Sequence, residues 1–219
     1  MNQVRDAVAS LRVLIVEDNN LTRISLASTC LLHGVEVVGE ASSAQEAMNL
    51  VTRNKKSDPN VALLDLDLGD GPTGIDLAWG LRRHNPQIGL VILSSYKDPR
   101  LTGRKLPDLP NFTQYLIKSE VENTEQLIET LLNSRVQEAS APTSKSNAHN
   151  LTDSEISLLR LVWEGHSNSE IAKLKSIAPK SVETAISRLS KKIDITYSNT
   201  INQRILLAKF YQELTGKVS

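Results

Sequence analysis

Five short apolar runs, separated by stretches with helical spacing, constrain the fold of this 219-residue chain more than any other feature. The runs cover residues 12–16, 35–38, 61–64, 88–93 and 115–117. Strands that alternate with helices are typical of a parallel sheet whose crossovers are right-handed. The sequence therefore predicts an α/β doubly wound, flavodoxin-like sheet with strand order 2-1-3-4-5.

Helical spacing predicts the segments between the strands. We expect helices at about 21–32, from Ser43 onward, at 74–84 and at 123–134, with a capping box in the SAQE that opens the second. The fourth connection, KDPRLTGRKLPDLPN, contains three prolines and a glycine. Proline breaks helices, so we expect a short, displaced or irregular element there.

Polar side chains follow four of the apolar runs at the point where each expected strand ends. They are Glu17 and Asp18, Asp65, Ser94 and Lys118. Ligands of open α/β sheets bind at the carboxyl ends of the strands, near the point where strand order reverses, so these residues converge on one phosphate-accepting pocket. Three carboxylates at one spot repel each other unless a cation joins them. Magnesium, which takes oxygen ligands and keeps several waters, meets that need.

The segments VLIVEDN, VALLDLDL, VILSS and YLIK resemble the receiver domain of two-component response regulators, over roughly residues 11–134. The resemblance implies that Asp65 is the phosphoacceptor and that a histidine kinase is a partner. It also implies further roles: Mg²⁺ ligands at Glu17, Asp18, Asp65 and the carbonyl of Asp67, phosphoryl contacts from Ser94 and Lys118, and a switch role for Tyr115.

Three departures from that pattern affect the expected loops. LGDGPTG carries one extra residue between Asp65 and Gly74, Ser119 stands where proline is usual, and KLPDLPN replaces a small-residue turn. We therefore expect a reshaped loop at 68–74.

The second half of the chain carries a different pattern. Residues 134–219 hold 12 Lys and Arg against 8 Asp and Glu, a net charge of +4, whereas residues 1–133 hold 13 against 17, a net charge of −4. A positive half favours a polyanionic partner. Two capping boxes, Thr152 to Glu155 and Ser167 to Glu170, predict two short successive helices.

A third helix is expected at about 179–192, with one apolar stripe and one polar, basic face. The segment 151–214 resembles the LuxR-type helix-turn-helix domain, whose second motif helix enters the major groove of double-stranded DNA. The expected DNA-binding residues on this face are Lys180, Ser181, Glu183, Thr184, Ser187, Arg188, Lys191 and Lys192. By the same resemblance, a last helix at about 199–214 carries the contacts of a homodimer.

The whole chain resembles NarL/FixJ-type response regulators. We expect a receiver at 1–133, a flexible linker rich in Ser, Ala and Asn at 134–150, and a DNA-binding domain at 151–219. The expected function is transcription regulation in which phosphorylation of Asp65 controls dimerisation and DNA binding. No apolar run has the length of a membrane span, so we expect a cytoplasmic protein. Because it resembles a phosphoacceptor regulator, we expect no enzyme activity beyond its own phosphorylation and dephosphorylation.

The sequence is also compatible with two other functions. DLDLGDG also resembles the start of haloacid-dehalogenase-type phosphatases, which use an aspartyl-phosphate and Mg²⁺, although Glu17 and Asp18 precede it here. The second alternative is a DNA-binding protein that does not depend on phosphorylation. Its first half would serve only as a dimerisation module.

Simpler structural roles compete with some of these interpretations. Asp18 and Asn19 fit a helix cap. An isolated basic face is most often a solvated helix surface. Trp79, Trp163 and the single cysteine, Cys30, are expected in the cores.

Overall fold

The computed structural model describes residues 2–53, 58–104, 106–121, 123–135, 151–195 and 202–215, without the side chains of residues 2–5. The chain forms two compact units. The first comprises 1–94 and 106–145, and the second comprises 95–105 and 146–219. The expected linker lies almost entirely outside the described residues, and so does the start of the expected last helix.

A five-stranded parallel sheet forms the centre of the first unit, and its strand order is β2-β1-β3-β4-β5 as predicted. The strands are β1 (Arg12–Val16), β2 (Glu36–Ala41), β3 (Val61–Asp65), β4 (Gly89–Ser94) and β5 (Thr113–Ile117). Every residue of β3 and β4 is buried, which explains why these strands are continuous apolar runs rather than alternating ones.

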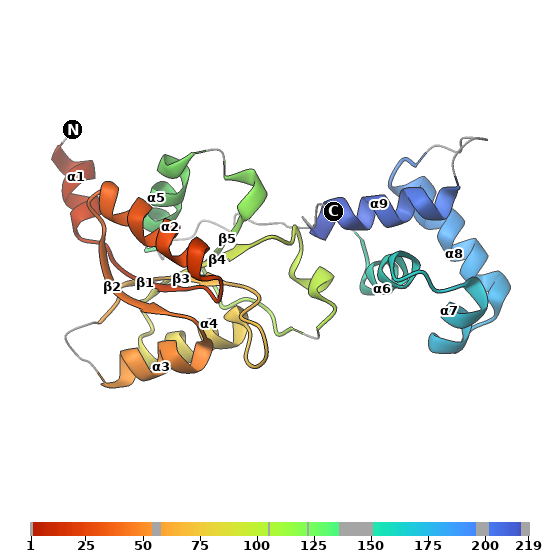
Figure 1. The fold of residues 1–219 in the computed structure, drawn as a ribbon, viewed down its shortest axis with the longest axis horizontal. Helices are drawn as coiled ribbons and strands as arrows, with labels where there is room; N and C mark the ends of the chain where they lie inside the picture. Colours follow the sequence, from red (N-terminus) through yellow and green to blue (C-terminus); the bar gives the residue numbers. More distant parts are fainter. Residues whose placement is uncertain are drawn as a thin grey trace. The chain divides into compact units, whose positions relative to one another are not determined.

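Helices cover both faces of this sheet (Figure 1). Helices α1 and α5 lie on the same side as α2, and α3 and α4 lie on the other. Their bounds are α1 (Asn2–Ala9), α2 (Asn20–Leu32), α3 (Ala44–Arg53), α4 (Gly74–His84) and α5 (Thr124–Asn133). Helix α1 is an addition that the strand pattern did not predict.

One detail of helix capping differs from expectation, and another was not predicted. Ser43 does cap α3 through its hydroxyl, but the Glu46 carboxylate accepts from the amide and hydroxyl of Ser42, not from Ser43. The N-terminus of α4 is fixed by a capping box between Thr73 and Asp76 that follows the glycine-containing loop.

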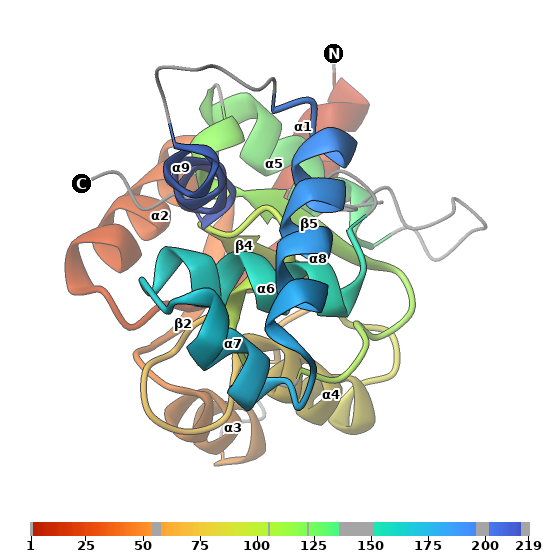
Figure 2. The same ribbon diagram turned by 90° about the vertical axis from the view of Figure 1, so that its right-hand side faces the viewer.

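The second unit is helical and contains α6 (Asp153–Trp163), α7 (Asn168–Leu174), α8 (Pro179–Lys192) and α9 (Gln203–Thr215). Both predicted capping boxes are present. Figure 2 shows the four helices of this unit. Helix α6 contacts α9, α7 contacts α8, and all four contribute to one apolar core.

Both tryptophan predictions were wrong. Trp79 is 38% exposed and donates its ring N–H to the carbonyl of Asp108, and Trp163 is 41% exposed and packs against Tyr211 with the two ring planes tilted by 39°. An indole with a polar N–H is stable at a half-exposed position where that group finds a partner. Cys30 is fully buried as predicted, and burial raises the pKa of its thiol to about 11. Within the described ranges, no helix has the length and apolar character needed to cross a membrane.

Candidate functional site

Three carboxylates meet at the carboxyl end of the sheet in the first unit. Glu17 and Asp18 follow β1, and Asp65 is the last residue of β3, which pairs with β1. One carboxylate oxygen from each lies within 4.8 Å of the others. Glu17 and Asp65 are buried while Asp18 is exposed, so the cluster has one side open to solvent.

Lys118 lies beside this cluster. It follows β5, and its ammonium nitrogen is 2.7 Å from Glu17 Oε2 and 3.2 Å from Asp65 Oδ2. Burial alone would lower the pKa of Lys118, but the carboxylates of Asp65 and Glu17 outweigh burial and raise the pKa. The lysine is therefore charged, and it neutralises part of the anionic cluster.

Asp65 has an unusual electrostatic environment. Burial raises the pKa of its carboxyl from 3.8 to about 7, opposed by Lys118 and assisted by the charges of Glu17 and Asp18. Desolvation of a charged carboxylate is costly, and Lys118 offsets only part of the cost. A divalent cation bound by oxygen ligands would complete the charge balance, so the donor set fits such an ion.

Ser94 and Tyr115 lie on the neighbouring strands. Leu93 pairs with Asp65, which places Ser94 one residue beyond it at the end of β4, fully buried. Tyr115 is half-buried on β5 and pairs with Ile92. Asp67 lies in the loop after β3, half-buried. The fold thus brings the ends of four strands to one edge.

Two residues that support this pocket were not predicted. Arg23 of α2 donates from Nη1 to the carbonyl oxygen of Glu17 at 2.7 Å, which fixes the end of β1. Gly74 lies so close to β3 that a Cβ would collide with the carbonyl oxygen of Asp65. The extra residue in LGDGPTG predicted an altered loop before Gly74. Nothing in the sequence, however, indicates where the Arg23 side chain points.

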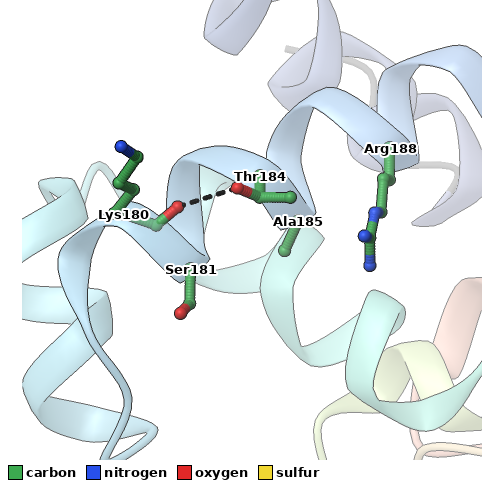
Figure 3. Close-up of a pocket in the computed structure, with 5 residues that line it drawn as sticks. All are labelled: Lys180, Ser181, Thr184, Ala185 and Arg188. Atoms are coloured by element: carbon green, nitrogen blue, oxygen red, sulfur yellow. Dashed lines mark hydrogen bonds between the residues drawn. The ribbon is translucent and has the colours of Figure 1, made fainter.

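The eight residues expected to bind DNA all lie exposed on α8 or at its last turn. Beneath them, Val182, Ile186 and Leu189 are buried, as predicted, while Ala185 and Ile193 are half-buried. A hollow of about 440 Å³ is lined by Lys180, Ser181, Thr184, Ala185 and Arg188. Figure 3 shows Lys180 and Arg188 near opposite ends of this stretch.

The exposed face of α8 has a polar row flanked by cations. Lys180, Thr184 and Arg188 are four residues apart, so they form one row that spans about 12 Å at 1.5 Å per residue. The Thr184 hydroxyl donates to the Lys180 carbonyl at 3.0 Å (Figure 3). Lys192 differs from the rest, because its ammonium contacts both carboxylate oxygens of Glu155 on α6.

Comparison with known families decides the identity of the chain. Residues 13–132 match the family described as response regulator receiver domain, and residues 149–200 match bacterial regulatory proteins of the luxR family. The chain is a response regulator. It combines a receiver domain with a LuxR-type helix-turn-helix, as the motifs predicted, and the phosphatase alternative is not favoured.

Individual relatives agree with this family. The response regulator protein VraR of Staphylococcus saprophyticus is 29% identical over 196 residues, which cover 84% of this chain and 91% of that protein. VraR of Staphylococcus aureus strain NCTC 8325 is 27% identical over 197 residues, with 85% and 91% covered.

Solved structures support the fold. A complex of the response regulator RcsB with DNA matches with a TM-score of 0.55 at 21% identity, covering 94% of this chain and 99% of that chain. A structure of two RcsB dimers on two parallel DNAs matches with a TM-score of 0.56 and the same coverage and identity. At this identity the likeness concerns the fold alone.

Proposed function

We propose that this response regulator accepts a phosphoryl group on Asp65 from a partner histidine kinase and thereby controls its own dimerisation and its binding to double-stranded DNA. The observation that carries the proposal is the strand-end cluster, in which a buried Asp65 adjoins two more carboxylates and the Lys118 ammonium. A nucleophile, an acidic pair and a cation are the parts that phosphoryl transfer to a carboxylate requires.

Glu17, Asp18 and Asp65, together with the carbonyl oxygen of Asp67, would hold one Mg²⁺. The ion would supply positive charge to the phosphoryl oxygens. Asp65 attacks phosphorus, the P–N bond to the kinase histidine breaks with its electron pair moving to nitrogen, and solvent supplies a proton there. Lys118 leaves its carboxylate partners to contact a phosphoryl oxygen, and Ser94 donates a hydroxyl hydrogen bond. Tyr115 then takes the space that Ser94 leaves.

The second unit supplies the output. Helix α8 would enter the major groove, which is about 12 Å wide, with Ser181, Glu183, Thr184 and Ser187 near base edges. Phosphates, or base edges at the rim of the groove, would be contacted by Lys180, Arg188, Lys191 and Lys192. Two units held as a homodimer would bind half-sites about one helical turn apart, with α9 at the dimer contact.

Phosphorylation of the full-length protein tests this function. With Mg²⁺ and acetyl phosphate, wild-type protein should gain the mass of one phosphoryl group, and Asp65→Asn should gain none. Asp70→Asn is the control, because Asp70 is an exposed acid of the same loop that the site does not use. Labelling of Asp65→Asn at the wild-type level would contradict the assignment of the phosphoacceptor.

A second measurement separates this function from phosphorylation-independent DNA binding. Beryllofluoride with Mg²⁺ mimics a bound phosphoryl group and should raise the melting temperature of the wild-type protein, because a ligand that binds only the native state stabilises it. DNA affinity should rise under the same conditions. Equal affinity with and without beryllofluoride, despite a thermal shift, would favour phosphorylation-independent binding.

A further inference from the structure

The Thr184 side chain lies between Lys180 and Arg188 on the exposed face of α8, and one hydrogen bond restricts what it can bind. Its hydroxyl donates to the Lys180 carbonyl at 3.0 Å, which also fixes the orientation of the side chain (Figure 3). A hydroxyl has one hydrogen and two lone pairs, so the Thr184 oxygen is left with an acceptor role only. It suits a partner that donates, such as an amino group, and it does not suit a phosphate oxygen.

Methyl groups lie beside this oxygen. With the hydroxyl directed at Lys180, the methyl group of Thr184 points away from Lys180 (Figure 3). Ala185 is half-buried, lines the same hollow as Thr184 and adds a second methyl group. The middle of the hollow therefore offers apolar contact and one acceptor, whereas Lys180 and Arg188 place cations toward its two ends.

Packing beneath α8 holds these groups in place. Val182 is fully buried and Ile186 is 5% exposed, and both belong to the core of the helical unit. At the last turn of α8, the Lys192 ammonium is 2.8 Å from Glu155 Oε2 on α6. Because the helix backbone and the Thr184 hydroxyl are both fixed, the two methyl groups are preorganised for a partner of matching shape.

DNA base pairs differ in the groups that they present in the major groove. A pair of thymine with adenine presents both the adenine amino group and the thymine methyl group. A pair of cytosine with guanine presents an amino group but no methyl group. An acceptor oxygen beside methyl groups therefore matches a T·A pair best. The cations toward the two ends of the hollow would contact phosphates or guanines at neighbouring positions.

We propose that Thr184 and Ala185 form a thymine-selective contact, and that each half-site of this regulator carries a T·A pair opposite them. The inference rests on the proposed function, because it requires α8 to enter the major groove. The adenine amino group donates to the Thr184 oxygen, and the thymine methyl group packs against the methyl groups of Thr184 and Ala185. Glu183 does not line the hollow, so its carboxylate is left to contact a neighbouring pair.

Uracil substitution tests the methyl contact directly, because uracil is thymine without its methyl group. The probe is a labelled duplex selected from a random library by the full-length protein in the presence of Mg²⁺ and acetyl phosphate. Each thymine of one half-site is replaced in turn by uracil, and affinity is measured by gel shift. At one position the affinity of the wild type should fall about fourfold, the effect of losing one buried methyl group.

Two substitutions identify the partner of the thymine methyl group. Thr184→Ser keeps the hydroxyl and deletes the methyl group, so uracil at that position should cost this variant less than twofold. Thr184→Val keeps the methyl group and deletes the hydroxyl, so uracil should still cost about fourfold, although overall affinity falls. Thr52→Ser is the matched control, because Thr52 is an exposed residue of α3 whose hydroxyl donates to the Met48 carbonyl at 2.8 Å. Its uracil cost should equal that of the wild type.

The outcomes separate this inference from the proposed function. If no uracil substitution lowers affinity, or if the selected half-site contains no T·A pair, the thymine contact is refuted while sequence-specific DNA binding stands. Equal uracil costs for the wild type and Thr184→Ser would also overturn the contact, because the Thr184 methyl group would then play no part in it. A selection that yields no preferred duplex would overturn the DNA-binding role and this inference together.

Discussion

The strand-end pocket, formed by Glu17, Asp18, Asp65 and Lys118, buries two carboxylates and pairs them with the lysine. The outer face of α8, in contrast, leaves its cations and hydroxyls exposed to solvent. Glu17 and Asp65 are 2% and 8% exposed and share Lys118. Lys180, Thr184 and Arg188 are exposed above a buried apolar stripe. A buried charge is stable only when neighbouring groups compensate it, so substitutions in the pocket should be costly. Residues on an exposed helix face can be substituted one at a time without disturbing the apolar stripe beneath them.

The largest expected effect comes from the backbone beneath the pocket. Gly74→Ala should destabilise the protein by about 3 kcal/mol in urea unfolding, because a Cβ at residue 74 would collide with the backbone of Asp65. Gly80→Ala, on the same helix, meets only the flexible side chain of Met48 and is the control. Equal stability of the two variants would show that the backbone of Asp65 has room for a side chain at residue 74.

Asp65→Asn should reveal the cost of burying charge. Its folded-state pKa of about 7 lies above 3.8, so the stability contributed by this carboxyl is fully present below about pH 3.8 and is lost as pH rises through about 7. Asparagine does not titrate. In metal-free buffer, the variant should therefore gain about 3 kcal/mol over the wild type between pH 4.5 and pH 8.

Thermal unfolding of both proteins across that range measures the difference. Asp70→Asn removes an equal charge from an exposed loop position that the cluster does not use and controls for net charge. A stability difference between Asp65→Asn and wild type that is independent of pH would mean that burial does not raise the pKa of the Asp65 carboxyl.

The two regions also differ in how far sequence predicts them. Strand order and strand-end residues follow from hydrophobic runs and from the topology of parallel sheets, so Asp65 and Lys118 could be placed together although 53 positions separate them. The face of α8 follows from helical period alone. Local periodicity and strand connectivity are both properties that a sequence displays directly.

Contacts that depend on side-chain direction or on the docking of irregular segments were not predicted. The prolines of 97–111 indicated an irregular element, but not that Leu101 would enter the core of the helical unit. Likewise, the exposure of Trp79 depends on the carbonyl of Asp108 across a loop. Such contacts are set by tertiary packing, which overrides the preference of each residue alone.

Thr184→Ala should change sequence preference at the α8 face. Its hydroxyl already donates to the Lys180 carbonyl, so its oxygen can only accept from a base. We expect a loss of about 1 kcal/mol on the preferred duplex and little loss on a scrambled one, measured by gel shift. Equal losses on both duplexes would remove Thr184 from the residues that read bases.

The smallest effect separates two adjacent lysines. Lys191→Ala should weaken binding to all duplexes alike, by somewhat under 1 kcal/mol, and reduce the slope of log affinity against log salt by about 1. Lys192→Ala should have a smaller effect on DNA, because the Lys192 ammonium is 2.8 Å from Glu155 and must give up that ion pair to reach a phosphate. Its loss should instead lower stability slightly, since Glu155 caps α6. If Lys192→Ala reduces the salt slope as much as Lys191→Ala does, Lys192 leaves Glu155 to bind DNA at little cost. In that case every cation of the α8 face is available to DNA, whereas the charges of the pocket are held by one another.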